Sequence, residues 1–201
     1  MTHIARAVMP VALLVTLGLA GCSATSTPHQ EPAPSAVAES PTPSATEEAP
    51  APAAGTRENP IPVDTLTEYD PASMWRFSVG ATNPDATADV IAQNQFNTVP
   101  AGSVFITAPL YLQVKPEGDP NGADPISSLL IEYVSAKGNS FQSNATCVVN
   151  DAPWNIGTMY PGAEGRGTIC AAVPADAVVG GAWKVTSIVK PDTFIFLDGA
   201  N

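Results

Sequence analysis

Trp75-Arg76-Phe77-Ser78-Val79 alternates large apolar side chains with polar ones, a pattern typical of a half-buried β-strand. Residues 110–115 and 129–134 repeat this alternation, and Gly, Pro, Asn and Asp interrupt the chain between such segments. Further short strands are expected at 146–149, 168–173, 183–188 and 193–197. Roughly seven to nine short strands at this spacing predict an all-β fold, an antiparallel β-sandwich.

Two segments between the expected strands allow more specific predictions. Residues 86–92 fit either a strand or a short helical turn, and we expect a strand. Asn94 and Asn97 flank Phe96, and we expect both asparagines to bond their own backbone in a turn that Phe96 anchors. A ligand-binding role for these asparagines is the alternative. Pro161-Gly162 predicts a type II turn, because glycine accepts a positive φ at the third position.

The first 21 residues have the layout of a secretory signal: Arg6, then 14 mostly apolar residues, then small residues before Cys22. This stretch is shorter than the roughly 20 residues of a membrane-spanning helix. Leu19-Ala20-Gly21-Cys22 resembles the lipobox of bacterial lipoproteins. The resemblance implies that residues 1–21 are a cleaved lipoprotein signal peptide and that Cys22 is the lipid attachment site. An ordinary secretory signal with a coincidental cysteine is the alternative.

A linker follows the lipidated cysteine, and the two together occupy residues 22–54. Residues 23–54 contain seven Pro, nine Ala, nine Ser or Thr and no aromatic residue. Because such a composition buries too little apolar surface to offset the entropy of ordering, a disordered linker is predicted. Every Trp, Tyr and Phe lies in residues 55–201, which we predict to be the folded domain. Two or more acyl chains on Cys22 would anchor it stably, at the extracellular face of a bacterial cell membrane.

The charge of the predicted domain limits its partners. The domain carries −8 of the net charge of −11, and its seven Lys and Arg residues are scattered singly. Without a basic patch, nucleic acid is excluded as an expected partner. The domain surface is equally unsuited to anionic lipid headgroups, so the membrane contact is expected through the lipid on Cys22 alone.

Cys147 and Cys170 remain as an even pair in an exported domain, where oxidation is expected. We therefore predict a disulfide between them. It would close a loop of 24 residues and stabilise the fold by about 3 kcal/mol in the loop-entropy description. A free or metal-binding pair is the alternative.

Five motifs occur in order along the domain: residues 55–62, 93–97, 100–105, 160–162 and 173–175. In this order they resemble the telokin-like, immunoglobulin-like extracellular domains of actinobacterial lipoproteins, which are related to the immunoprotective extracellular proteins. The resemblance covers residues 55–197 and implies an immunoglobulin-like antiparallel β-sandwich at the cell surface, with no established enzymatic activity. The chain departs from antibody-type domains, whose two cysteines lie on facing sheets. We expect the Cys147–Cys170 bridge to be a staple on neighbouring strands or their loop.

The predicted domain contains few residues that could carry out catalysis. Both histidines, His3 and His29, precede residue 55, which removes the usual general base and most zinc or haem ligation. Acidic residues cluster between 64 and 70, before the first strong strand, and those between 119 and 124 are expected to form an ordinary turn rather than a calcium site. We therefore predict no enzymatic activity, no catalytic residues, no metal site and no cofactor. A hydrolase with converging carboxylates is the minor alternative.

Trp154 and Tyr160 lie in the loop that the predicted disulfide closes. We expect them mainly to cover one end of the sandwich, and they are also the aromatic pair that we name as a candidate ligand surface. The predicted function is a lipid-anchored, non-enzymatic binding or interaction domain with a protein or envelope ligand. The alternative is a carrier or chaperone-like domain that holds a small apolar or cell-envelope ligand in a cleft.

Overall fold

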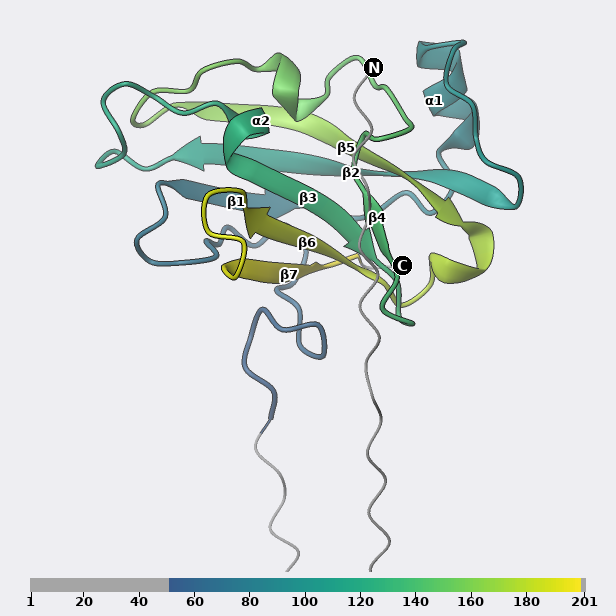
Figure 1. Ribbon diagram of the computed structural model, residues 1–201, viewed down its shortest axis with the longest axis horizontal. Helices are drawn as coiled ribbons and strands as arrows, with labels where there is room; N and C mark the ends of the chain where they lie inside the picture. Colours follow the sequence, from purple (N-terminus) through teal and green to yellow (C-terminus); the bar gives the residue numbers. More distant parts are fainter. Residues whose placement is uncertain (1–50, 200–201) are drawn as a thin grey trace, which may run out of the picture. The chain divides into compact units, whose positions relative to one another are not determined.

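The computed structural model describes residues 51–199, which contain seven strands in two antiparallel sheets (Figure 1). One sheet has the order β1-β2-β5: β1 (Trp75–Val79), β2 (Ser103–Val114) and β5 (Glu164–Pro174). The other has the order β4-β3-β6-β7: β4 (Ser140–Gln142), β3 (Leu129–Val134), β6 (Ala182–Ser187) and β7 (Phe194–Asp198). This is an immunoglobulin-like β-sandwich, in which the fourth strand pairs with the third rather than the fifth. The predicted fold class is confirmed.

The N-terminal predictions concern residues that the structure leaves out. Cys22, the signal peptide at 1–21 and the linker up to residue 50 lie outside the described residues. None of the helices in the described part, 51–199, is long and apolar enough to cross a membrane.

Short helices connect the strands: α1 (Thr87–Gln93), α2 (Pro125–Ser128) and the 3₁₀ turns η1 (Pro153–Asn155) and η2 (Ala175–Ala177). The expectation of a strand at 86–92 was wrong, because this segment is α1. Its buried residues Ala86 and Val90 are four positions apart, which is helical spacing. The Asp85 carboxylate, one residue before the N-cap Ala86, accepts a hydrogen bond from the Thr87 backbone N–H at 3.1 Å, in a turn that leads into the helix.

The expected strand at 146–149 was also wrong, although burial does alternate there. Cys147 and Val149 are buried and Val148 is exposed, as in a half-buried strand. No strand is assigned to these residues, which pack with Phe105 and Val90 over the outer face of the β1-β2-β5 sheet. A disulfide and a side-chain amide hold this segment in place of a neighbouring strand. The alternation of buried and exposed residues is the same in both situations, so the sequence pattern cannot distinguish them.

The main core lies between the sheets. Phe77 of β1 pairs with Leu112 of β2, and both are buried. On the facing sheet Tyr133 of β3 pairs with Trp183 of β6, and their rings meet edge to face at 5.2 Å. The Trp183 indole donates to the Thr82 hydroxyl at 2.9 Å, so its buried N–H is satisfied. The predicted alternation at residues 75–79, 129–134 and 183–187 thus faces this core.

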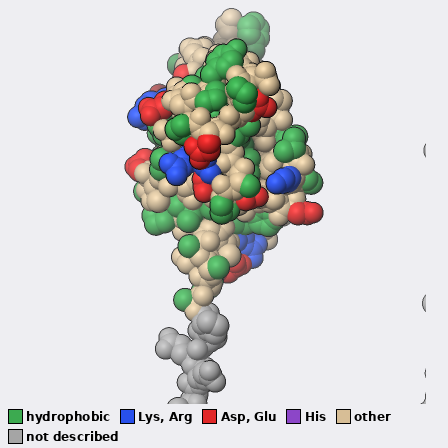
Figure 2. All heavy atoms as spheres, turned by 90° about the vertical axis from the view of Figure 1, so that its left-hand side faces the viewer, with side chains coloured by type: hydrophobic (Ala, Val, Ile, Leu, Met, Phe, Trp, Pro, Cys, Tyr) green, Lys and Arg blue, Asp and Glu red, His purple; other side chains and the backbone are tan. Residues whose placement is uncertain are grey.

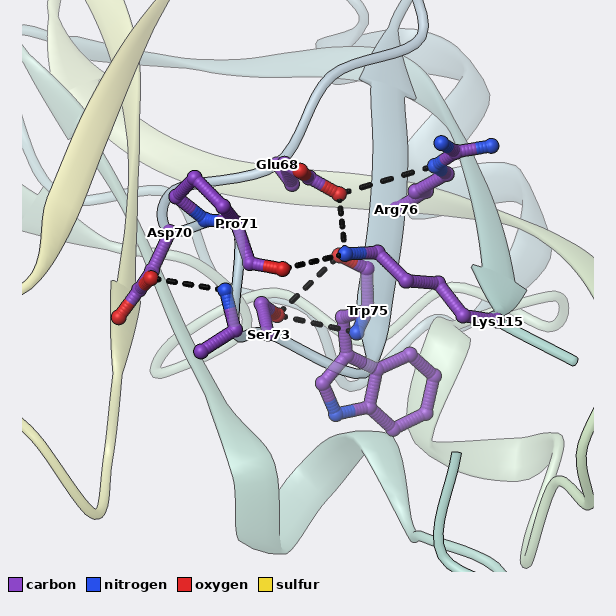
Figure 3. Close-up of polar contacts among 8 residues, drawn as sticks. Glu68, Asp70, Pro71, Ser73, Trp75, Arg76 and Lys115 are labelled. Carbon is purple, nitrogen blue, oxygen red and sulfur yellow. Dashed lines mark hydrogen bonds and ion pairs between the residues drawn. The ribbon is translucent and has the colours of Figure 1, made fainter. Parts of the chain in front are cut away.

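A buried lysine fixes the segment that precedes β1. Lys115 Nζ lies 2.6 Å from a Glu68 carboxylate oxygen and donates to the Pro71 carbonyl at 2.9 Å (Figure 3). Arg76 approaches the same carboxylate at 3.7 Å. Because these bonds pair the buried ammonium, residues 68–71 are held at the end of β2.

Two sheet edges are covered by the chain that leads into β1. Ile61 runs parallel to β7, where its N–H donates to Phe196 O at 2.9 Å and its carbonyl accepts from Asp198 N at 2.7 Å. Thr67 and Phe77 exchange two backbone hydrogen bonds of 2.9 Å at the edge of β1. The proline-rich segment around Ile61 therefore occupies a sheet edge, where its missing N–H groups cost little.

The remaining two edges are also short or covered. The Asn144 N–H donates to Cys170 O at 2.6 Å, and the Thr168 N–H donates to Asp151 O at 3.0 Å, so the loop after β4 lies along β5. β4, at the edge of the other sheet, has only three residues. No long strand edge is left open within residues 51–199, which limits pairing between copies.

Candidate functional site

An apolar cavity of about 290 Å³ lies beside α2. Leu110 and Leu112 of β2 line it from one sheet, and Leu129 and Ile131 of β3 line it from the other. Trp154 of η1 also contributes to its wall. A concave, mostly apolar space between rigid elements is the usual form of a small-molecule site.

The sequence of β5 explains how a loop reaches this cavity. In the β2–β5 register, Leu110 is opposite Gly167 and Leu112 is opposite Gly165. The loop after β4 fills the place of the absent side chains: a Cβ on Gly167 would lie 2.7 Å from Asp151 O. A Cβ on Gly165 would lie 2.9 Å from Ile156 Cδ1. The two glycines therefore admit residues 151–156, which include the cavity residue Trp154.

The predicted disulfide is present and holds this loop. Cys147 is bonded to Cys170 of β5 with a Cα–Cα distance of 6.1 Å, and both residues are fully buried. The bridge joins a loop to a strand of one sheet and does not cross between the sheets, as expected from the spacing of the cysteines. It constrains the chain between the cavity residues Ala145 and Pro153.

Asn144 supplies the unusual polar group of the cavity. Its φ of 60° is in the left-handed region, which asparagine tolerates better than most residues. Asn144 lines the cavity, its amide nitrogen donates to the neighbouring Ser143 hydroxyl, and its Oδ1 is buried without a hydrogen-bond partner. If the amide is turned over, the nitrogen becomes the unpaired atom instead. Either orientation leaves a buried polar atom unsatisfied, which costs about 1–3 kcal/mol.

The structure separates the two aromatic residues of the candidate ligand surface. Trp154 is half-buried and lines the cavity, whereas Tyr160 is exposed and is absent from the cavity lining. Tyr160 begins the turn predicted at Pro161-Gly162: its carbonyl accepts from Ala163 N at 2.9 Å, and Gly162 has a φ of 80°. Only Trp154 of this pair therefore adjoins the cavity.

The asparagines around Phe96 behave differently from one another. Asn94 Oδ1 accepts from the Phe96 N–H at 3.0 Å, which is the predicted local turn. Asn97 is buried and instead bonds to Val90, seven residues earlier, and to Val148, 51 residues later. Phe96 does not anchor the turn, because its side chain is 82% exposed.

The acidic residues serve local structure. Asp124 caps α2 by accepting from Ile126 N at 3.0 Å, and Asp119 accepts from Asn121 N at 2.8 Å. Among residues 51–199, no group of three or more His, Cys, Asp or Glu side chains is arranged to hold a metal ion. Hydrogen bonds from the Thr87 side chain and backbone lower the pKa of Asp85. Desolvation by burial is the main cause that raises the pKa of Tyr111, and the neighbouring Glu164 carboxylate raises it further. Neither group lines the cavity.

Comparisons with known proteins find two solved structures of low similarity. No family model and no curated protein match the chain. A conserved hypothetical protein from Bacillus anthracis is 13% identical, with a TM-score of 0.44 over 69% of this chain and 95% of that chain. An uncharacterized β-sandwich protein from Clostridium difficile is 12% identical, with a TM-score of 0.38 over 64% and 87%. Neither similarity assigns a function.

Proposed function

We propose that this chain is a non-enzymatic, lipid-anchored binding protein of the bacterial cell surface, and that its sandwich holds a small apolar ligand in the cavity beside α2. The proposal places it among the telokin-like domains of actinobacterial lipoproteins that residues 55–197 resemble. Its anchor is the lipid on Cys22, and the linker keeps the domain at a distance from the bilayer. Of the two functions predicted from the sequence, the carrier of a small apolar ligand is favoured.

The observation that carries this proposal is an apolar cavity whose lining includes one unpaired amide. Leucine and isoleucine side chains from both sheets line it, so an apolar group that binds there would lose part of its contact with water. Burial of apolar surface contributes about 25 cal/mol per Å². The Asn144 amide would gain the hydrogen bond that it lacks in the protein, which favours a ligand with one polar atom over a pure hydrocarbon.

The size of the cavity limits the ligand. Drug-sized ligands occupy pockets of roughly 300–1,000 Å³, and this cavity of about 290 Å³ is at the small end of that range. It therefore fits a small molecule, or the apolar part of a larger one.

The test is binding of N-phenyl-1-naphthylamine, an uncharged apolar probe that fluoresces in dry surroundings. Ala145 lines the cavity and is exposed, so Ala145→Trp would obstruct the cavity with little strain on the core. We expect saturable probe binding that Ala145→Trp weakens at least about tenfold. Ala101→Trp, an exposed change in the turn before β2, is the matched control and should bind normally. Absence of binding, or equal binding by all three proteins, would overturn the proposal.

A further inference from the structure

A groove with a mixed polar and apolar lining lies on the other side of α2 from the apolar cavity. It has a volume of about 460 Å³, and its lining includes Asp119, Asp124, Ser127 and Lys190. Figure 2 looks onto this end of the sandwich, where acidic and basic side chains gather among apolar ones. The groove is therefore chemically unlike the cavity next to it.

The partition between the two spaces is only one helical turn and one loop residue wide. Pro125 and Ile126 of α2 line the cavity, whereas Asp124 and Ser127 line the groove. Ile188 closes the partition, because its N–H donates to the Ser128 carbonyl at 3.0 Å and its side chain lines the cavity. A ligand longer than the cavity would cross this partition and reach the groove.

The partition is itself apolar at the surface. Ile126, Ile188 and Val189 are 58%, 46% and 80% exposed, although large aliphatic side chains are usually buried. Ile126 and Ile188 line the cavity and Val189 lines the groove, so the three form an apolar ridge between them.

We propose that the cavity, the ridge and the groove form one continuous site for an amphiphile whose polar end is uncharged and carries hydroxyl groups. This inference rests on the proposed function, because the apolar part of the ligand would occupy the same cavity. The ridge would cover the middle of the ligand, and the groove would hold its hydroxylated end.

The groove offers donors and acceptors that hydroxyl groups can satisfy together. Trp75 lines the groove, is 1% exposed, and its indole N–H has no hydrogen-bond partner. In Figure 3 the indole nitrogen is on the side of the ring turned away from Lys115. Lys190, whose Nζ is 3.8 Å from Asp70 Oδ2, has further N–H donors, and Asp119 and Asp124 each use one carboxylate oxygen in their own turns. A hydroxyl both accepts and donates, so it can bond either kind of group.

Charged head groups fit this arrangement less well. Three aspartates, Asp70, Asp119 and Asp124, line the groove with a single lysine, so an anionic head group would meet net negative charge. An ammonium head group would be attracted but has no acceptor atom for the Trp75 N–H. A hydroxylated, uncharged head group is the one that leaves neither the donors nor the acceptors unpaired.

Three indole N–H groups make the test direct, because the protein has only three tryptophans. Trp154 lines the cavity, Trp75 lines the groove, and Trp183 is a buried control bonded to Thr82. The indole signals of the ¹⁵N-labelled protein are followed by NMR as n-octyl glucoside is added below its micelle concentration. Trp→Phe variants assign the signals. We expect the Trp154 and Trp75 signals to shift in parallel while the Trp183 signal stays in place.

The outcomes separate this inference from the proposed function. If the naphthylamine probe and octyl glucoside shift Trp154 while Trp75 is unmoved, the cavity binds ligands and the continuous site is wrong. If neither compound shifts Trp154, the proposed function fails as well. Octyl sulfate and octyltrimethylammonium carry the same chain, and either one binding as tightly as octyl glucoside would overturn the assigned head-group chemistry.

The role of the ridge can be tested with two exposed valines, one on the ridge and one outside it. Val189→Ser removes apolar surface from the ridge, and we expect it to weaken octyl glucoside binding about two- to fourfold. Val179, which is also exposed but lies after η2 and lines neither space, provides the control Val179→Ser. Equal affinity of the two variants for octyl glucoside would overturn the role of the ridge.

Discussion

The side chain of Asn97 serves as a strand partner for Val148. Its Oδ1 accepts from the Val148 N–H at 2.8 Å and its Nδ2 donates to the Val148 carbonyl at 2.8 Å, across 51 positions of sequence. The same Nδ2 donates to the Val90 carbonyl in α1 at 2.9 Å. One buried amide thus joins α1 to the loop that the disulfide holds on β5.

Asn97→Asp keeps the shape of this side chain but removes both donated hydrogen bonds and turns a carboxylate toward two carbonyl groups. We expect the free energy of unfolding to fall by about 2–4 kcal/mol, measured by urea denaturation. Asn94→Asp is the control, because the Asn94 side chain accepts a hydrogen bond from the Phe96 N–H and an aspartate accepts it equally well. A similar stability for both variants would show that the Asn97 bonds contribute little.

Replacing both Cys147 and Cys170 by serine should lower the free energy of unfolding by about 3 kcal/mol. Because the bridge also holds the loop that carries Ala145 and Trp154 at the cavity, the naphthylamine probe should bind more weakly to the folded double variant. Thermal unfolding and probe titration under oxidising conditions measure the two effects. An unchanged melting temperature would mean that the bridge adds no stability.

Asn144→Gly removes the unpaired amide without straining the backbone, since glycine accepts a φ of 60° freely. We expect the naphthylamine probe, which has one N–H donor, to bind about two- to tenfold more weakly. Asp64 also has a positive φ, of 56°, and does not line the cavity, so Asp64→Gly controls for the backbone change. Undiminished probe binding by Asn144→Gly would exclude the amide as a ligand contact.

The Asp85 carboxylate should contribute stability that depends on pH. Hydrogen bonds from Thr87 lower its pKa below the ordinary value of 3.8, so folding favours the charged form. This contribution is present above the unfolded pKa and is lost as the pH falls through the lower folded pKa. The stability difference between the protein and Asp85→Asn, measured by urea denaturation, should therefore shrink from pH 5 down to the acid limit of folding. A constant difference over that range would contradict the assigned role.

Cys22→Ala tests the lipid anchor. Without the thiol that accepts the lipid, the protein should be released to the medium or remain unprocessed, and it should leave the detergent phase in phase partitioning. The Cys147→Ser variant is the control, because it also loses a cysteine but keeps Cys22. Unchanged partitioning of Cys22→Ala would exclude lipidation at this residue.

The sandwich was predictable because the central strands carry their burial pattern in their own residues. Trp75, Phe77 and Val79 are buried and alternate with exposed or half-buried neighbours, as the sequence indicates. The errors occur where the partner is distant. Val148 has a strand-like pattern, but its partner is the side chain of Asn97, and no local rule relates the two.

The cavity could not be predicted for a similar reason. It depends on Gly165 and Gly167 lying opposite two leucines of β2, and on a loop that fills the space they leave. The register that brings these residues together arises only after the sheet forms. Asn144 also carries no sequence signal, because its left-handed backbone and unpaired amide depend on the path of the loop. Trp154 was named as a candidate contact because loop aromatics often bind ligands.

The covered strand edges matter when many copies of the domain lie close together. If many copies are tethered side by side on one membrane, each is held within reach of its neighbours for long periods. Open strands would then recruit one another and build fibres along the surface. The segment around Ile61 covers the edge of β7, and the loop after β4 covers the edge of β5, so a neighbouring domain finds no open strand there to pair with.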